Sequence, residues 1–336
     1  MADLQSPKDR ITLRNGYGIP CLGFGTWKMP DGEVGIDAVH QALHDGYRHI
    51  DTAAAYENEG TVGKALASGD VSREDLFITT KVWNSDRGYD ATLKAFEKSL
   101  DRLHLDYVDL YLIHWPAAEH RDANWKSTNA DTWRALESLY LDGKVRAIGV
   151  SNFKPEHLEP LMDTAQILPM VDQIEFHPGY VQWETVEFCR ASQILVEAWS
   201  PLGRQRLADD PLLAELAGKY GVSQAQICLR FALDCGVVPC QVGRRWTDAP
   251  EPGAGLCPGG GGLGAAADHA PDRLVRPAPG QVSRRDRREP VLPRACGEDG
   301  PFRIYSSDWY WAQTSSTKSQ NRWTAGRTLR SLGRNI

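Results

Sequence analysis

The sequence predicts an α/β protein whose core is a closed barrel of eight parallel strands, a (β/α)8 fold, preceded by an N-terminal β-hairpin. Eight short apolar runs lie between residues 21 and 238, and segments with helical spacing separate them. The first run is followed by Gly23-Phe-Gly-Thr-Trp27, which lacks the GxGxxG turn expected of a doubly wound sheet. A length of 336 residues suits a single barrel.

The elements follow in chain order. Residues 10–20 read RITLRNGYGIP, and the Asn15-Gly16 pair between two alternating runs predicts the hairpin. The predicted strands are residues 21–25, 47–50, 76–80, 108–113, 145–150, 170–174, 194–198 and 237–238. The predicted helices include residues 35–44, 89–103, 131–141, 155–164, 185–191 and 223–233. Ser223 and Gln226 have the spacing of a capping box, and Pro155 stands at a first-turn position.

The composition changes near Cys240. Residues 1–239 carry a net charge of −12, whereas residues 240–336 carry +6, with 13 Gly, 9 Pro and only 12 Ile, Leu or Val. We therefore predict an incomplete barrel over 1–239 and an atypical, poorly ordered tail over 240–336, with the last β/α unit incomplete or altered. A short eighth strand is expected to expose a sheet edge and to lower stability by several kcal/mol, out of the usual ~5–15.

Three origins of the tail are open. A basic nucleic-acid-binding arm is the weakest, because no RGG or Lys/Arg block repeats and we expect no nucleic-acid partner. A natural disordered tail, or a cloning artefact, is a second interpretation. The third is a frameshift in GC-rich coding sequence, since the run GGGGL at 259–263 is what in-frame glutamate codons give when they are read one base off.

Several sites are not expected. No apolar run approaches the ~18 residues of a membrane span, and MADLQSPKDR does not resemble a signal peptide. Seven cysteines without a CxxC or a Cys/His metal spacing predict free thiols and no metal site. We expect a cytoplasmic protein without membrane contact.

Polar or aromatic residues follow every predicted strand before the eighth. Taken singly, each has an ordinary structural explanation, such as a loop cap or a satisfied core histidine. In a barrel, however, the carboxyl ends of all strands meet at one mouth, so the set together predicts an active site. Its members are Thr26, Trp27, Asp51, Tyr56, Lys81, His114, Ser151, Asn152, Gln173, Glu175, Trp199 and Ser200.

These residues lie in segments that resemble the aldo-keto reductase family, over about residues 11–239. The segments are GFGTW (23–27), RHIDTAAAYENEGTVGKAL (48–66), FITTKVW (77–83), LDYVDLYLIHWP (105–116), GKVRAIGVSNF (143–153), DQIEFHP (172–178) and EAWSPLG (197–203), in the family's order. The resemblance, which extends to diketogluconate reductase-like members, implies a TIM-barrel enzyme that reduces aldehydes, ketones or sugar-derived carbonyls with NADPH; NADH is a possible substitute.

The resemblance also implies catalytic roles. It makes Tyr56 the proton donor, Lys81 and Asp51 its supporting ion pair, and His114 the residue that orients the substrate carbonyl. The chemistry agrees, because a free tyrosine with a pKa near ~10 is a weak acid at neutral pH and a neighbouring ammonium stabilises its phenolate. The buried charge of Lys81 in turn requires a partner such as Asp51.

Cofactor and substrate contacts are implied in the same way. The residues that match cofactor contacts are Thr26, Lys28, Asp51, Ser151, Asn152, Gln173, Trp199, Ser200, Leu202 and Gly203. Ser151, Asn152 and Gln173 match the groups that hold the nicotinamide carboxamide, and Trp199 matches an aromatic residue that stacks on its ring. Trp27, Trp83 and Trp115, with His114, match the substrate pocket, where indole walls favour apolar or aromatic aldehydes or the flat face of a sugar.

The resemblance stops after Pro239. The lysine and serine that grip the 2′-phosphate of NADPH in the family are not recognisable, and Arg244 and Arg245 are the nearest substitutes. The preference for NADPH over NADH is expected to fall accordingly. We expect a monomer that acts on a small-molecule carbonyl compound. The alternatives are a cofactor-binding barrel with little turnover, like redox-sensing channel-associated members of the fold, and a frameshift-damaged product without function.

Overall fold

The computed structural model describes residue 4 and residues 6–242. The predictions for residues 243–336, including the lack of a docked eighth helix and the substitute roles of Arg244 and Arg245, lie outside the described residues. Within the described part, no helix is both long and apolar enough to cross a membrane.

The chain opens with the predicted hairpin. Strand β1 (Arg10–Thr12) pairs antiparallel with β2 (Gly18–Pro20), with Arg10 opposite Pro20. At the turn Gly16 adopts a φ of 83°, which an L side chain rarely tolerates. Asn15 accepts from Tyr17 N at 3.1 Å and donates to Arg146 O at 2.9 Å, so the turn is tied to the barrel wall.

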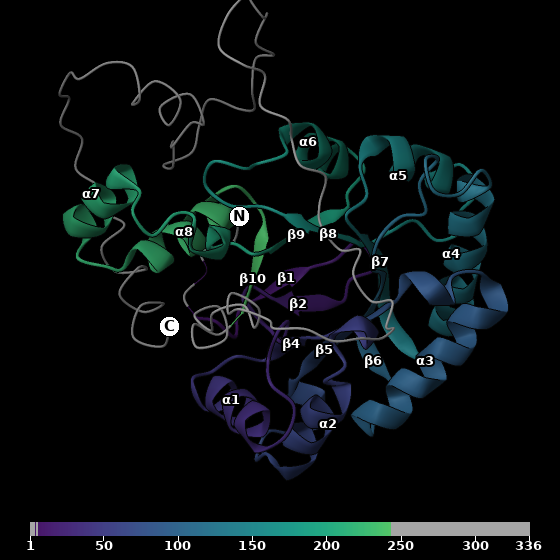
Figure 1. Cartoon of the computed structure of the whole chain (residues 1–336), viewed down its shortest axis with the longest axis horizontal. Helices are drawn as coiled ribbons and strands as arrows, with labels where there is room; N and C mark the ends of the chain where they lie inside the picture. The colour runs from purple at the N-terminus through teal and green to yellow at the C-terminus, as the bar shows by residue number, and fades with distance from the viewer. Residues whose placement is uncertain (1–3, 5, 243–336) are drawn as a thin grey trace, which may run out of the picture. The chain divides into compact units, whose positions relative to one another are not determined.

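Eight parallel strands follow and close into a barrel, as predicted (Figure 1). They are β3 (Gly23–Gly25), β4 (His49–Asp51), β5 (Phe77–Val82), β6 (Val108–Ile113), β7 (Val145–Ser151), β8 (Val171–Glu175), β9 (Leu195–Trp199) and β10 (Val238–Val242). Each predicted strand overlaps an observed one, and most bounds differ by one or two residues. The β6 bounds agree fully.

The prediction of a short last strand with an exposed sheet edge is wrong. Strand β10 extends to Val242, and its two halves pair with different neighbours: Val238 lies opposite Glu197 of β9, whereas Val242 lies opposite Gly25 of β3. The strand continues past Pro239 because the following residues, Cys240–Val242, still offer backbone groups to β3. The composition break therefore begins inside the barrel strand and does not interrupt closure.

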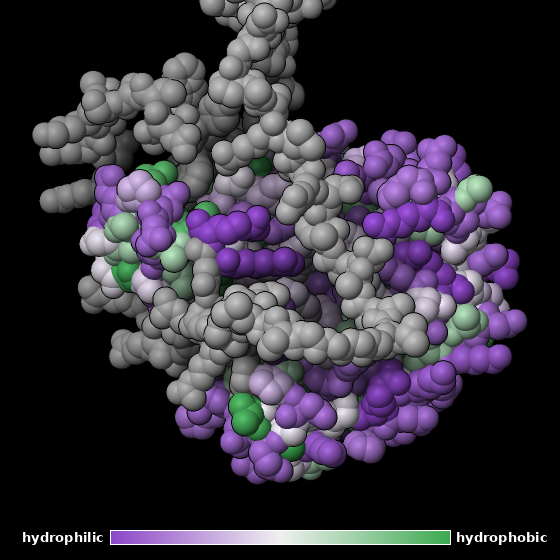
Figure 2. All heavy atoms as spheres, in the orientation of Figure 1, coloured by the Kyte–Doolittle hydropathy of each residue, from purple (hydrophilic) through white to green (hydrophobic). Residues whose placement is uncertain are grey.

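The helices surround the strands (Figure 1). They are α1 (Glu33–His44), α2 (Glu59–Ser68), α3 (Tyr89–Leu103), α4 (Trp125–Leu141), α5 (Pro155–Met162), α6 (Trp183–Ala191), α7 (Pro211–Tyr220) and α8 (Gln224–Asp234). The six predicted helices all appear, α3 with the predicted bounds, and α4 begins at Trp125 rather than at residue 131. Pro155 occupies the first turn of α5, and Ser223 and Gln226 form the predicted capping box. Over α3, α4 and α5 the outer surface is predominantly hydrophilic, as expected of amphipathic helices (Figure 2).

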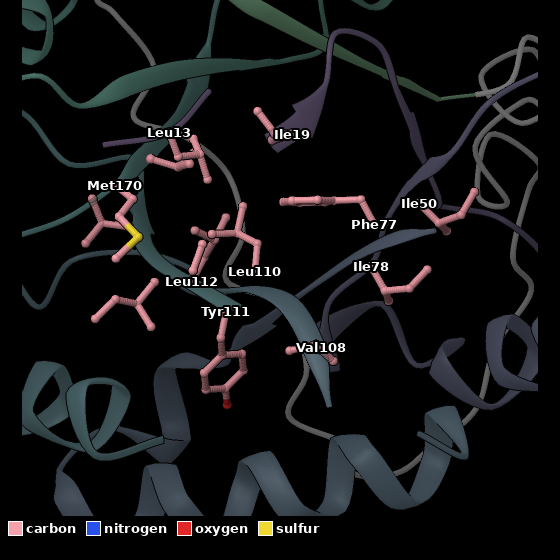
Figure 3. Packing of buried hydrophobic residues seen from close by; sticks show 14 of the residues in the cluster. Leu13, Ile19, Ile50, Phe77, Ile78, Val108, Leu110, Tyr111, Leu112 and Met170 are labelled. Atoms are coloured by element: carbon pink, nitrogen blue, oxygen red, sulfur yellow. The ribbon is translucent and has the colours of Figure 1, made fainter. Parts of the chain in front are cut away.

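Apolar side chains and the hairpin fill one end of the barrel. Ile19 of β2, Phe77 of β5 and Leu110 of β6 belong to one buried cluster (Figure 3). The Tyr17 hydroxyl donates to Asp109 at 2.6 Å, and its ring stacks on Phe77 at 5.9 Å. This end, at the amino-terminal side of the strands, is thereby closed, which leaves the carboxyl ends of the strands to carry polar groups.

Candidate active site

A buried ion pair lies at the carboxyl ends of β4 and β5. Lys81 Nζ donates to Asp51 Oδ1 and Oδ2, both at 2.7 Å, and to Thr52 O at 2.9 Å. Lys81 is fully buried and Asp51 nearly so. Burial on its own lowers the pKa of Lys81, but the Asp51 carboxylate outweighs it and the net shift is upward. The lysine therefore stays charged in the barrel interior.

Tyr56 and His114 lie beside this pair. Tyr56 ends the short 3₁₀ turn Ala54–Tyr56 after β4, and Lys81 Nζ is 5.2 Å from the centre of its ring. His114, which directly follows β6, meets Tyr56 edge-on with ring centres 5.6 Å apart. Four residues that are distant in sequence thus converge at one point, as the strand-end positions predicted.

The pKa of the Tyr56 hydroxyl is raised to about 12. Burial is the largest cause, and the Lys81 ammonium opposes it by favouring the phenolate. The sequence correctly predicted the direction of the lysine's effect but not the larger effect of burial. Tyr56 consequently carries its proton at neutral pH.

The three tryptophans expected at the mouth differ in their surroundings. Trp83 packs edge-on against His114, with ring centres 5.0 Å apart. Trp115 is 41% exposed, and Trp27 is half-buried. Trp83 is thus the indole that the structure places directly against the Tyr56–His114 pair.

The polar residues after β7, β8 and β9 form one hydrogen-bonded chain. Trp199 Nε1 donates to Asn152 Oδ1 at 2.8 Å, and Asn152 Nδ2 donates to His114 O at 2.9 Å. The Ser151 hydroxyl donates to Gln173 O at 2.7 Å. Asn152 has a φ of 64°, a conformation that asparagine adopts more readily than most residues. The structure therefore brings these four predicted residues together.

The loop after β9 carries a cation that the sequence did not single out. The Arg204 guanidinium carbon lies 4.8 Å from the ring centre of Trp27 and 5.0 Å from that of Trp199, so it bridges both indoles. Arg204 Nε also donates to the Ser200 hydroxyl at 3.2 Å. Lys28 Nζ lies 4.8 Å from the Trp27 ring. The neighbouring Leu202 is half-buried and Gly203 is buried.

Two further predicted residues are held away from the mouth or at its margin. Thr26 is fully buried, and its carbonyl accepts from Asn58 Nδ2 at 2.8 Å. Glu175 accepts from Arg206 at 2.6 Å, which anchors the loop after β9. Burial on its own raises the pKa of Glu175, but hydrogen bonds from His177 and Arg206 lower it overall.

One buried group inside the barrel also escaped sequence analysis. His49, Asp51 and Glu197 offer ligand atoms within 4.8 Å of one another, a spacing compact enough for a metal ion among the described residues. The Lys81 ammonium and the Gln173 amide nitrogen already contact these carboxyl groups. Glu197 stands two residues before the strand end, and that inward-facing position was its only sequence signal.

Comparison with known proteins decides the family. A sequence model of the "Aldo/keto reductase family" matches residues 21–245. The chain belongs to the aldo/keto reductase family. A glyoxal reductase of Bacillus subtilis (strain 168) is 52% identical over 233 residues, which cover 69% of this chain and 82% of that protein.

Solved aldo/keto reductases have the same fold. The crystal structure of such a reductase from Brucella melitensis matches with a TM-score of 0.66 and 44% identity, covering 71% of this chain and 91% of that one. An aldo-keto reductase of Bombyx mori in complex with NADP matches with a TM-score of 0.64 and 36% identity, covering 73% and 86%. This aldo/keto reductase is therefore a barrel oxidoreductase, and family membership supports carbonyl reduction.

Proposed function

We propose that this chain reduces the carbonyl group of an aldehyde, ketone or sugar-derived compound with NADPH, and that Tyr56 is the proton donor. The convergence of Tyr56, Lys81, Asp51 and His114 carries the proposal. Small dicarbonyl compounds such as glyoxal are the first substrates to test, because a glyoxal reductase is about half identical to the matched region.

The roles follow from the site's geometry and charge. Tyr56 is protonated at neutral pH and can give its proton to a developing alkoxide, a stronger base than phenolate. Lys81 lies 5.2 Å from the ring and stabilises the phenolate that remains. Asp51 keeps the lysine charged, and His114, packed against Tyr56 and Trp83, positions the carbonyl oxygen.

The residues present fit a nicotinamide cofactor, which when bound supplies the hydride. Gln173 Nε2 donates to two carboxyl groups, so its amide oxygen is the end that can accept from a carboxamide. Ser151 and Asn152 add polar atoms, and Trp199 offers a flat ring. Thr26, Lys28, Ser200, Leu202 and Gly203 complete the proposed cofactor contacts, with Lys28 and Arg204 as exposed cations suited to phosphate groups. Thr26 takes part through the backbone, since its side chain is buried.

Trp27, Trp83 and Trp115, with His114, form the proposed substrate pocket. Trp83 contacts His114 directly, and Trp115 is exposed enough to meet an incoming molecule. Indole walls favour apolar or aromatic aldehydes, and a flat sugar face as well.

The test is NADPH consumption by the purified full chain with glyoxal, methylglyoxal, aromatic aldehydes and keto sugars, repeated with NADH. We expect turnover with at least one class and faster turnover with NADPH. NADPH binding by fluorescence titration without multiple turnovers favours the non-catalytic barrel instead. Failure to bind and a non-cooperative thermal unfolding curve indicate a damaged product.

The origin of the tail is tested separately. If the tail is a frameshift product, inserting or deleting one base near codon 240 of the coding DNA restores a lysine, a serine and an acidic amphipathic helix. If neither alternative frame yields them, the tail is a genuine extension. Our proposals of a cytoplasmic, monomeric enzyme are tested by cell fractionation and by light scattering.

A further inference from the structure

A second carboxyl group, Glu197, lies beneath the Lys81–Asp51 pair. Glu197 is on β9, directly opposite Gln173 of β8, and is fully buried. Gln173 Nε2 donates to Asp51 Oδ2 and to Glu197 Oε2, both at 2.8 Å. An amide nitrogen has two hydrogens, and both are used here. Turning the amide over would set its oxygen against two carboxyl groups, so Glu197 helps to fix which end of Gln173 faces the mouth.

The local charges leave Glu197 without a cation. Lys81 contacts both oxygens of Asp51, and a second buried carboxylate without its own partner is costly. The other titratable groups around Glu197 are His49 on β4, Tyr56 in the turn after β4, and Cys240 on β10. Burial, and then Lys81, lowers the pKa of His49 to about 3, so this histidine is neutral. Burial also raises the pKa of the Cys240 thiol.

The geometry indicates where a proton on Glu197 belongs. Oε2 accepts from Gln173, whereas Oε1 faces His49 Nδ1 at 3.6 Å. Neither Oε1 nor His49 Nδ1 has a hydrogen-bond partner among the residues that the structure describes. His49 Nε2 lies 2.9 Å from the Thr79 hydroxyl. A proton on Oε1, aimed at Nδ1, therefore satisfies two buried atoms at once.

We propose that Glu197 is a positioning residue of the site, which in its protonated form holds the Gln173 amide and, through it, Asp51, and whose loss of the proton slows carbonyl reduction. The inference rests on the proposed function. An ionised Glu197 adds a negative charge beside Asp51, which disfavours the Tyr56 phenolate and makes Tyr56 a weaker acid. Burial, and then the Asp51 charge, raises the pKa of Glu197 to about 8, so the change falls in an accessible range.

The first experiment compares pH profiles of kcat at saturating NADPH and carbonyl substrate, each normalised to its own value at pH 7. For one ionisation near pH 8, kcat of the unmodified chain falls about tenfold between pH 7 and pH 9. Glu197→Gln is expected to lack this step. Asp172→Asn is the matched control, because Asp172 is also fully buried but faces Cys189 of α6, 3.8 Å away. It should keep the step.

A second comparison separates positioning from general damage. Glu197→Leu removes the acceptor for Gln173 and is expected to weaken NADPH binding several-fold, measured by tryptophan fluorescence without turnover. Glu197→Gln, whose side-chain oxygen can still accept, should recover most of that loss. Equal binding by the glutamine and leucine variants would overturn the positioning role.

Infrared difference spectra provide a test that does not depend on turnover or on a Glu197 variant. In Asp172→Asn, a protonated carboxylic acid band at pH 7 should disappear by pH 10, because Glu197 then loses its proton. Absence of this band, or a Glu197→Gln pH profile identical to that of the unmodified chain, overturns the proposal. Failure of the proposed function is distinguishable, since the unmodified chain would then consume no NADPH at pH 7 with any substrate while the infrared and binding results still decide the state and role of Glu197.

Discussion

At the residue scale, the site depends on how few charges the barrel interior must stabilise. Lys81 and Asp51 neutralise each other over two contacts of 2.7 Å. Around them, burial keeps His49 neutral and keeps Tyr56 protonated. The interior therefore holds one ion pair and several neutral groups, which a low-dielectric environment favours.

This arrangement predicts a pH-dependent stability for Glu197. Its pKa is about 8 in the folded chain against an ordinary value of 4.5, so between these pH values the unfolded chain releases a proton that the folded chain keeps. Stability consequently falls as pH rises through that window and levels off above it. Glu197→Gln cannot ionise, so its stability relative to the unmodified chain should increase from pH 5 to pH 8. Urea unfolding at several pH values measures this difference, and a constant difference contradicts the assignment.

Sequence analysis located the residues that reach the mouth but not those that support them. Tyr56, Lys81 and His114 follow predicted strands, which was enough to bring them together. Glu197 faces inward below the mouth, and its importance depends on a neighbour, Gln173, that only the closed barrel supplies. Arg204 lies on an irregular loop, where no periodicity predicts that it meets two indoles.

At the element scale, local signals predicted helices well where the helix buries apolar residues. Helix α2 was missed because its buried positions include the polar or small residues Glu59, Thr61 and Gly63, which weaken the apolar period. Helix α7 was missed because it is peripheral and buries only Leu213. Its ends were nevertheless marked, since Asp210 caps it, Pro211 begins it and Gly221 ends it with a φ of 65°.

The capping box of α8 gives a prediction at the same scale. Ser223 Oγ accepts from Gln226 N at 3.3 Å, while Gln226 Oε1 accepts from Ser223 N at 2.8 Å. Ser223→Ala should lower the free energy of unfolding by about 1 kcal/mol. Ser72→Ala is the matched control, because Ser72 precedes a short 3₁₀ turn without capping it through its side chain. Equal effects of the two variants in urea unfolding would show that the cap contributes nothing.

At the scale of the whole molecule, barrel closure is the feature that sequence analysis judged wrongly. The composition changes near Cys240, but Cys240–Val242 still complete a strand against β3. Composition averages over many residues, whereas strand pairing requires only a few extended ones. The family match likewise continues to residue 245. The prediction of a poorly ordered tail stays a prediction.

Close strand packing in the barrel wall can be tested at Gly149 of β7. A Cβ atom there would lie 2.4 Å from Val171 O and 2.8 Å from a Leu112 methyl group. Gly149→Ala should therefore destabilise the chain by more than about 2 kcal/mol, because the β8 backbone must move. Gly218 of α7 has open space around it, and Gly218→Ala should stabilise the helix by up to about 1 kcal/mol. Thermal unfolding of both variants checks the contrast, and a neutral Gly149→Ala would contradict the packing described.

The whole account depends most directly on Tyr56. The decisive measurement is kcat for NADPH-dependent reduction of glyoxal by Tyr56→Phe, which keeps the ring against His114 but removes the proton that is to be donated. Loss of general acid catalysis predicts a fall of about 10²–10⁴-fold, with NADPH binding by fluorescence titration unchanged. A Tyr56→Phe enzyme that reduces glyoxal at the unmodified rate would contradict the assignment of the proton donor and, with it, the proposed mechanism.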